Sequence, residues 1–515
     1  IAWPRTISDN PGVQYTLVRR GEPNGPTRGD RQVALIDVDE GSGAAELSPA
    51  KQKPLTKLPP AEATANSYVM DVFRLGVGKT HHYYFHGMVS DQFEWNATDV
   101  EPYPADAKPM GISFPPRDSN GSGKAPAYFT ATWRMQRENN DVSTNGHERN
   151  QLGSSYDPST PPKFLRLHLF DVEGARAERA QFTTHTPAKN ELTMIGLTRE
   201  VANQRDGSIF IGLIEPYAGN PIIRQASSVQ IAGNETDAQR AVAMRVETVN
   251  GHDDLLIADG RPDKTRSLPG QVRFAGEFGY LSKDAQGLRA ATITGGTRLE
   301  SPQIRLKVER AVWSGNVTAV DYDNKLITID QPWPARQAHF LAEIGHKDKA
   351  TSYTLTKVQP QGNSSVLTAR HGADYFLSPI QQVVVEPKNK PADSRTAPQP
   401  AVDEDDPAGA EKQQAKIQGP VKTTILASIT QTPGPGVGMQ KSWVLSDGAG
   451  SKFWRANASG GRSFVLLQDE PLADGELEVG GEVRLWEYGV GDQVHQRTSA
   501  SVIRSEEGVY RVTAT

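Results

Sequence analysis

Histidine and tyrosine side chains are concentrated in residues 76–87, which read GVGKTHHYYFHG. Both side chains can give or take a proton within hydrogen-bonding distance of a substrate. An ordinary tyrosine has a pKa near ~10, so a tyrosine that acts as a base needs a cation close by. The segment therefore contains residue types suited to acid–base chemistry, provided that the fold places a substrate and a cation beside them.

The first five residues of this segment, GVGKT, look like the end of a phosphate-binding loop. Such a loop needs a glycine, four further residues, then Gly-Lys-Ser/Thr, with a helix after it. Gly78, Lys79 and Thr80 supply the end, but Phe73 stands where the first glycine belongs. The aromatic run that follows is typical of a strand, not of a helix start that could receive phosphate. We therefore interpret the match as chance.

The aromatic run predicts a strand, in which alternate side chains lie on opposite faces. His82, Tyr84 and His86 then share one face, and His81 and Tyr83 lie on the other. Tyrosine in a strand is usually a packing residue, and histidine between aromatic residues is more often a core or hydrogen-bonded group than a ligand. A structural role and a functional role both remain open for this run.

A zinc site at this strand would need ligands from more than one strand. Residues four apart on a strand are separated by ~13 Å, whereas zinc binds histidine nitrogen at ~2.0–2.1 Å. His82 and His86 therefore cannot both bind one zinc ion from a regular strand. Asp71 and Asp37 lie on predicted strands that could pair nearby and supply carboxylate ligands.

The elements that must position these residues are short strands. Residues 67–75 read SYVMDVFRL, which places Tyr68, Met70, Val72 and Arg74 on one face. No stretch has the pattern of an amphipathic helix of normal length, so we expect an all-β fold, a large antiparallel β-sandwich (supersandwich-like) with additional C-terminal strands. Further strands are predicted at 128–134, 164–171, 208–215, 240–248, 482–489 and 508–514, and a hairpin at 316–330 with its turn at 322–325.

Composition divides the chain further. Residues 386–420 hold six prolines and only two large apolar side chains, so this segment cannot bury enough surface to order itself. We expect a large β-sandwich domain at 1–310, a β-hairpin-rich continuation at 311–385, a flexible linker or mobile excursion at 386–420, and strands closing the sandwich at 421–515.

Charge and composition exclude several classes of protein. The net charge of −5 offers no basic surface for nucleic acid, and no run reaches the ~18 apolar residues of a membrane helix. The 515 residues contain no cysteine, which removes disulfides and Cys-zinc sites. Because the sequence begins at Ile1, we expect a processed or partial chain. Six Asn-x-Ser/Thr sites weakly favour an exported protein, secreted or at the cell surface: Asn96, Asn120, Asn234, Asn316, Asn363 and Asn457.

Two further residues carry titratable groups within predicted strands. Glu215 is expected to be a buried carboxylate that faces Arg199 or Arg205 in a structural ion pair. His168 shares a strand face with Arg166 and is expected to be structural.

Several segments together resemble a known family. Residues 67–87, SYVMDVFRLGVGKTHHYYFHG, resemble a signature strand pair in the β-sandwich of heparinase II/III-like polysaccharide lyases. LTREVANQRDGSIFIGLIEPYAGNPII, DDLLIADGRPDKT and EYGVGDQVHQRTSASVIR resemble later segments of the same proteins, in the same order. The chain departs from the family in three ways, one of which is the absence of the family's Asn/His-x-His-x-Asp stretch near the start of the sandwich. It lacks the helical (α/α) toroid that precedes the sandwich, and it has His82 where the pattern usually reads Asp.

The resemblance implies cleavage of an acidic, uronic-acid-containing polysaccharide by β-elimination, supported by zinc. By analogy with the family, Tyr84 and His82 are the expected catalytic residues. The expected zinc ligands are His86, in the F-H-G position, then His82, together with Asp71.

The remaining expectations concern the substrate and the missing half. Arg74 and Tyr83 are expected to bind substrate. An absent α/α-toroid domain or chain would complete the site, so the isolated chain should bind acidic polysaccharide weakly and not cleave it. The alternative is a non-catalytic carbohydrate-binding or cell-surface structural β module.

Overall fold

The computed structural model confirms the predicted all-β architecture of stacked antiparallel sheets. The chain divides into two units, of which the first comprises Ala2–Trp313 and Gln496–Thr515 and the second comprises Ser314–His495. The second unit is therefore inserted in the sequence of the first. The structure describes residues 4–10, 13–20, 29–38, 67–87, 90–97, 101–102, 111–113, 128–135, 163–183, 191–203, 207–337, 340–346, 349–370, 374–377, 380–387, 421–426, 429–431, 442–447, 452–458, 463–466, 477–505 and 508–514.

The first unit is built around an eight-stranded sheet with the order β1-β2-β3-β4-β13-β10-β9-β6. Because neighbouring strands are hydrogen-bonded in register, side chains that alternate along each strand form two continuous faces. The strands are β1 (Pro4–Asn10), β2 (Val13–Arg20), β3 (Gly29–Asp37), β4 (Ser67–Leu75), β6 (Ser90–Ala97), β9 (Tyr128–Met135), β10 (Lys163–Phe170) and β13 (Ser208–Ala218).

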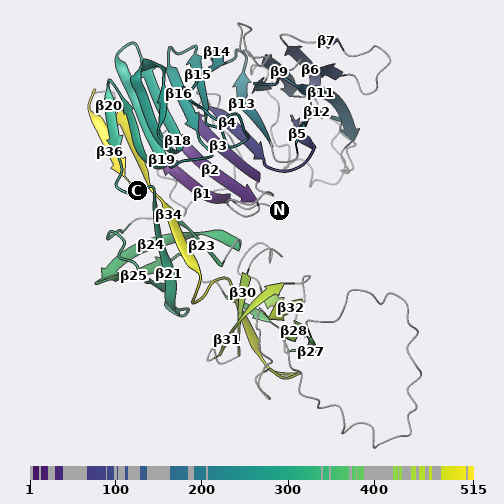
Figure 1. The fold of residues 1–515 in the computed structure, drawn as a ribbon, viewed down its shortest axis with the longest axis vertical. Helices are drawn as coiled ribbons and strands as arrows, with labels where there is room; N and C mark the ends of the chain where they lie inside the picture. The colour runs from purple at the N-terminus through teal and green to yellow at the C-terminus, as the bar shows by residue number, and fades with distance from the viewer. Residues whose placement is uncertain are drawn as a thin grey trace, which may run out of the picture. The chain divides into compact units, whose positions relative to one another are not determined.

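One face of this sheet packs against a nine-stranded sheet with the path β14-β15-β16-β18-β19-β35-β36, where β17 pairs with β18 and β20 with β19 (Figure 1). Tyr15 stacks on Phe278 with ring centroids 4.9 Å apart, and Tyr68 donates a 2.6 Å hydrogen bond to Asp254. The strands are β14 (Ile223–Ser228), β15 (Val242–Thr248), β16 (Asp253–Ala258), β17 (Arg266–Leu268), β18 (Val272–Asp284), β19 (Gly287–Ser301), β20 (Ile304–Lys307), β35 (Ser499–Arg504) and β36 (Tyr510–Ala514).

The opposite face packs against a five-stranded sheet with the order β5-β12-β11-β8-β7. Trp133 lies in the shared core and donates a 2.9 Å hydrogen bond to the carbonyl of Thr193. The eight-stranded sheet is therefore the middle of three layers, buried on both sides over much of its area. The strands are β5 (Thr80–His86), β7 (Glu101–Pro102), β8 (Gly111–Ser113), β11 (Ala175–Thr183) and β12 (Glu191–Glu200).

The inserted unit contains a closed barrel, β21-β22-β25-β24-β23-β34, and an eight-stranded sheet, β27-β28-β32-β31-β30-β33-β26-β29. The predicted turn at 322–325 joins β21 and β22. The strands are β21 (Val312–Asp321), β22 (Leu326–Ile329), β23 (Phe340–His346), β24 (Lys349–Gln361), β25 (Ser364–Ala369), β26 (Asp374–Leu377), β27 (Gln382–Pro387), β28 (Val421–Leu426), β29 (Ile429–Gln431), β30 (Ser442–Asp447), β31 (Phe453–Ala458), β32 (Ser463–Leu466), β33 (Val483–Trp486) and β34 (Gln493–Arg497).

The chain leaves and rejoins the first unit at one point. The backbone N–H of Thr498 donates a 3.0 Å hydrogen bond to the carbonyl of Ala311. The Thr498 hydroxyl lies 2.5 Å from the carbonyl oxygen of Arg310. After this point the chain continues into β35, which pairs with β19 in the nine-stranded sheet.

The predicted strands are confirmed as β4, β9, β10, β13, β15, β33 and β36, with ends that differ by a few residues. Of the predicted linker at 386–420, only Glu386 and Pro387 are described, at the end of β27, and the rest lies outside the described residues. The proposed division at 310, 385 and 420 stays a prediction beside the observed units. None of the described residues forms a helix long and apolar enough to cross a lipid bilayer.

Candidate functional site

The histidine and tyrosine run forms β5, and its side chains alternate between two faces as predicted. His82, Tyr84 and His86 are exposed, and 58% of the Tyr84 surface is accessible. His81 and Tyr83 are buried between the five-stranded and eight-stranded sheets. Only the first group could therefore meet a ligand from solvent.

The exposed face of β5 carries a small aromatic platform. The ring centroids of His82 and Tyr84 are 5.6 Å apart, with an angle of 11° between the ring planes. The Tyr84 ring lies over Gly196 of β12, where an added Cβ atom would come within 2.9 Å of the ring. His82 Nδ1 lies 3.0 Å from the hydroxyl of Thr198. The two predicted catalytic residues are thus adjacent, on an open sheet surface.

The predicted zinc ligands do not converge on one point. His82 and His86 lie on the exposed face of β5, and His86 Nδ1 is 2.9 Å from the carbonyl oxygen of Gly87. Asp71, the expected carboxylate ligand, is buried on the other side of that strand, between the sheets. Within the described ranges, no group of three or more His, Asp or Glu side chains is placed to hold a metal ion. These residues do not fit a zinc site.

Asp71 joins two sheets instead. Its carboxylate accepts hydrogen bonds from Arg31 Nε at 2.8 Å and Nη2 at 2.7 Å, and from the Tyr83 hydroxyl at 3.0 Å. Burial, and then the charge of Asp71, raises the pKa of Tyr83 well above its ordinary value. Strands β3 and β4 pair as expected, but Asp37 lies opposite Ser67 rather than beside Asp71. In this geometry Tyr83 and Asp71 are structural residues.

Arg74 has no accessible surface. Its Nη1 donates to the carbonyls of Ala238 and Arg240 at 3.0 and 2.8 Å, and its Nη2 donates to Ala258 at 3.1 Å. Its Nε donates to Gln32 at 3.1 Å. Burial lowers the pKa of Arg74 to about 10. The guanidinium group therefore links the eight-stranded sheet to the nine-stranded sheet and is not positioned to bind substrate.

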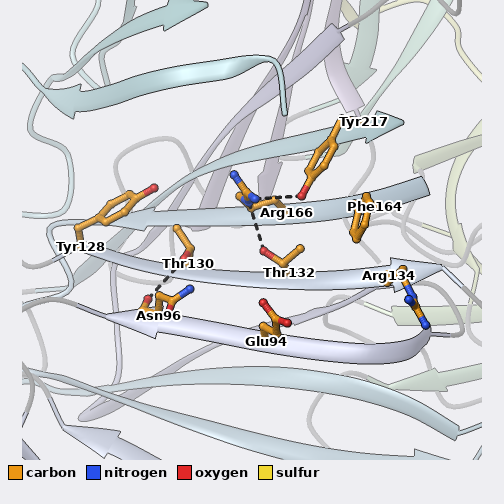
Figure 2. A pocket seen from close by; sticks show the side chains of 9 residues that line it. All are labelled: Glu94, Asn96, Tyr128, Thr130, Thr132, Arg134, Phe164, Arg166 and Tyr217. Atoms are coloured by element: carbon orange, nitrogen blue, oxygen red, sulfur yellow. Dashed lines mark hydrogen bonds between the residues drawn. The ribbon is translucent and has the colours of Figure 1, made fainter. Parts of the chain in front are cut away.

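A pocket of about 340 Å³ opens on the eight-stranded sheet, on the face that elsewhere packs against the nine-stranded sheet (Figure 2). Side chains from β6, β9, β10 and β13 form it, because hydrogen-bonded neighbours in a sheet point to the same side. The lining residues are Glu94, Asn96, Tyr128, Thr130, Thr132, Arg134, Phe164, Arg166 and Tyr217.

Arg166 lies near the middle of this group and is held by its neighbours. Its Nη2 donates to the Tyr217 hydroxyl at 2.9 Å, and its Nε donates to Thr132 at 3.2 Å (Figure 2). The guanidinium carbon lies 5.1 Å from the centre of the Tyr217 ring, which also stacks on Phe164 at 5.0 Å. These contacts fix the direction of the guanidinium group without using its Nη1.

A buried polar chain adjoins the pocket. The Tyr128 hydroxyl lies 2.6 Å from His168 Nδ1, and His168 Nε2 lies 3.0 Å from Glu215 Oε2. The other oxygen of Glu215 accepts the backbone N–H of Ile223 at 2.7 Å. Arg166 Nη1 is 3.8 Å from Glu215 Oε2. Burial raises the pKa of Tyr128 to about 12.

The buried carboxylate predicted at Glu215 is present, with no exposed surface, but Arg199, one of its two expected partners, does not pair with it. Arg199 donates instead to the carbonyls of Ile209 and Asp171, at 2.8 and 2.7 Å. Glu215 faces His168 and Arg166 because the antiparallel register of β10 and β13 places these residues across from or next to it. Arg205 lies outside the described residues.

The pocket was not anticipated from the sequence. Its signal was present as polar residues at alternate positions of β6 and β9 and as two such residues on β10, opposite apolar residues that build the core. Arg166 and His168 alternate with Leu167 and Leu169, and Thr132 alternates with Trp133. What the sequence could not show is that these strands are neighbours.

No protein-family model matches this sequence, and no curated protein is similar to it. The geometry of the two sites is therefore the basis for assigning a function.

Proposed function

We propose that this chain binds an acidic polysaccharide through the pocket on β6, β9, β10 and β13. The observation that supports the proposal is the composition of the pocket wall, which has two arginines, three aromatic rings, and hydroxyl and amide side chains on one sheet face. This activity is common to both functions expected from the sequence, the β-sandwich part of a lyase and a carbohydrate-binding module.

The uncharged side chains of the pocket suit a sugar. A sugar ring presents hydroxyl groups around its rim and apolar C–H groups on its faces, so it needs hydrogen-bonding groups next to aromatic surface. Thr130, Thr132 and Asn96 provide hydroxyl and amide groups, and Phe164 and Tyr217 provide the stacked aromatic wall. Tyr128 closes the other end of the drawn group (Figure 2).

The charged side chains favour an acidic sugar. Arg134 and Arg166 place two guanidinium groups among the lining residues, against one carboxylate, Glu94. A guanidinium group binds a carboxylate through two parallel hydrogen bonds when its orientation is fixed. Tyr217 and Thr132 fix the orientation of Arg166.

Binding to polygalacturonate tests the proposal, with fully methyl-esterified pectin as the uncharged counterpart of the same backbone. We expect the wild-type chain to bind polygalacturonate in preference to the ester, and to lose affinity as salt is added. Arg166→Gln should weaken binding by at least about tenfold, because an ionic hydrogen bond contributes roughly 1.5–3 kcal/mol.

Arg305→Gln is the matched control. Arg305 lies on β20, its side chain is 74% exposed, and it has a 3.6 Å ion pair with Glu300. This variant should bind as the wild type does, and circular dichroism should show that both variants fold. Equal losses in the two variants, or equal binding of polygalacturonate and its ester, would refute the assignment of the pocket.

The lyase function is proposed on the resemblance of the strand segments alone. In that case the pocket would hold part of the polymer, and an α/α-toroid domain or chain would supply the rest of the catalytic groups. We propose that the protein is exported, either secreted or at the cell surface, because that is where such a polymer is met. Because Asp71 and the two exposed histidines do not converge, zinc has no part in this proposal.

A further inference from the structure

A carboxylate at Glu215 would give the buried chain Tyr128–His168–Glu215 a single direction of hydrogen bonding. Glu215 Oε1 accepts the backbone N–H of Ile223 at 2.7 Å, and Oε2 faces His168 Nε2 at 3.0 Å. Two donors directed at one carboxyl group match a carboxylate that accepts both bonds. His168 Nε2 then carries the ring proton, so Nδ1 is the acceptor in the neutral imidazole. In this tautomer the Tyr128 hydroxyl, 2.6 Å from Nδ1, is the donor of that bond.

The three residues also differ in their access to solvent. Glu215 has no exposed surface, and His168 has 3% of its surface exposed. Tyr128 is half-buried and lines the pocket, and Figure 2 shows its hydroxyl end directed toward the side of Arg166. The chain thus runs from a buried carboxylate to a hydroxyl at the pocket, as a relay of protons would require.

We infer that Tyr128 is an acid–base group of the pocket and that His168 and Glu215 form a relay which accepts and returns its proton. The inference rests on the proposed binding of an acidic sugar there. With a sugar carboxylate held by Arg166, the hydrogen on the adjoining carbon is the most acidic C–H group of the ligand. This hydrogen is the one assigned to the relay.

The proton transfer balances within the three residues. The C–H bond breaks, and its electron pair is delocalised into the ligand carboxylate, which gives an enediolate whose charge Arg166 neutralises. The proton moves to the Tyr128 oxygen, while the former hydroxyl proton moves to His168 Nδ1. Glu215 stabilises the imidazolium cation so formed. The reverse transfer returns a proton to the carbon, so that no further reactant is needed.

The electrostatics of the site agree with a relay rather than with a free tyrosinate. Burial raises the pKa of Tyr128 to about 12, which keeps its hydroxyl protonated at neutral pH unless a base takes the proton in the same step. The charged or titratable groups around the His168 imidazole are Glu215 on β13, Arg166 on β10 and Tyr128 on β9. From β14, the backbone N–H of Ile223 reaches Glu215. Tyr217 and Glu94 lie further along the same face.

Exchange of the ligand hydrogen for solvent deuterium tests the inference without requiring cleavage. Oligogalacturonate is incubated with the full chain in D₂O, and loss of the H5 signal is followed by proton NMR. We expect exchange with the wild type. At saturating oligogalacturonate, Tyr128→Phe and His168→Gln should each lower the rate by at least roughly 100-fold, the usual contribution of a general acid–base group. His168 does not line the pocket, so binding of oligogalacturonate should persist in His168→Gln.

Tyr510→Phe serves as the matched control, since Tyr510 is an exposed residue of β36 whose hydroxyl donates to the Leu288 carbonyl at 3.1 Å. It should exchange as the wild type does. Binding without exchange in the wild type, or unchanged exchange in Tyr128→Phe, would overturn the relay and leave the proposed binding intact. Absence of oligogalacturonate binding would overturn both.

A measurement without ligand examines the relay directly. In ¹⁵N-labelled protein the His168 signals are assigned by their loss in His168→Gln. We expect the Nε2-protonated tautomer, with an Nδ1 shift that changes in Tyr128→Phe and not in Tyr510→Phe. Protonation at Nδ1 alone would contradict the direction of the relay, because Tyr128 could then not give its proton to His168.

Discussion

Tyr83 in the five-stranded sheet donates its hydroxyl hydrogen bond to Asp71 in the facing eight-stranded sheet, with 3.0 Å between the two oxygens. Arg31 binds the same carboxylate through two nitrogens, so that Asp71 has both oxygens engaged. A predicted substrate-binding residue and a predicted zinc ligand thus form a contact between layers of the core.

Tyr83→Phe should destabilise the first unit by about 1–2 kcal/mol, since it removes one partner of a buried charged hydrogen bond and keeps the ring. Tyr84→Phe is the matched change on the exposed face of the same strand and should cost less than about 0.5 kcal/mol. Urea denaturation followed by circular dichroism measures both. A larger loss for Tyr84→Phe would contradict the structural role of Tyr83.

Arg74→Met should destabilise the protein by at least about 3 kcal/mol, because four acceptors in the buried contact between sheets lose their donor. Arg74→Lys should recover only part of this loss, since an ammonium group cannot reach acceptors on both sides as a planar guanidinium does. The midpoint of denaturation reports the order wild type, Lys, Met. A stable Arg74→Met variant with weakened polysaccharide binding would restore Arg74 as a substrate residue.

Removal of metal should leave the fold unchanged. Dialysis against a chelator is expected to shift neither the melting temperature nor polygalacturonate binding, because the predicted zinc ligands lie on opposite sides of β5. Zinc retained in a one-to-one ratio, and lost in His86→Ala or His82→Ala, would show that the residues rearrange to bind it.

Acid should weaken an ion-pair network near β17. Burial opposes ionisation of Glu235, but hydrogen bonds from Lys264 and Arg266 outweigh it and lower its pKa from 4.5 to about 2. A lowered pKa in the folded state means that the stabilisation is fully present above pH 4.5 and is lost as the pH falls toward 2. The melting temperature of Glu235→Gln should therefore lie below that of the wild type at neutral pH. The difference should vanish as the pH approaches about 2.

Melting temperatures across this range supply the comparison, with Glu309→Gln as the control. Glu309 is 78% exposed and has a 3.7 Å contact with Arg310. It should show no such pH dependence. A gap between Glu235→Gln and wild type that widens with acid would reverse the sign of the linkage.

The isolated chain should bind acidic polysaccharide and not cleave it. Elimination needs a base, an acid for the leaving oxygen and a neutralised carboxylate held together, and loss of one member removes most of the rate. Ultraviolet absorbance of the C4–C5 double bond gives a direct assay on a panel of uronic-acid polymers. Cleavage by the chain alone would place a complete catalytic set in these sheets. Failure together with an α/α-toroid half on every polymer would favour the binding module.

The strands could be predicted from the sequence because their signal is local. Burial alternates along residues 67–75 except at the buried Asp71, and β4 begins and ends at the residues predicted. The same pattern grouped Arg74 with Tyr68, Met70 and Val72, a buried face, so its burial was already implied. The charge of Arg74 suggests substrate binding, whereas its position on the buried face of the strand indicates a structural role.

The pocket could not be predicted because it depends on pairing between distant strands. Glu94, Thr132, Arg166 and Glu215 lie in one row across β6, β9, β10 and β13. No spacing in the sequence fixes that order, since antiparallel strands separated by long connections can be arranged in many ways. The exposed histidines of β5 lie within one short segment, so they can be recognised without knowledge of the strand order.

The hydrogen bond from Thr498 to Ala311 has a consequence for biosynthesis. During translation β19 leaves the ribosome long before β35, because the whole inserted unit is made between them. Until β35 arrives, residues 290–294 of β19 lack their partner on the edge where β20 pairs only with residues 298–301. An unpaired strand edge favours association with other nascent chains. The barrel and the second eight-stranded sheet can fold during this interval, so the inserted unit can be complete before β35 completes the nine-stranded sheet of the first unit.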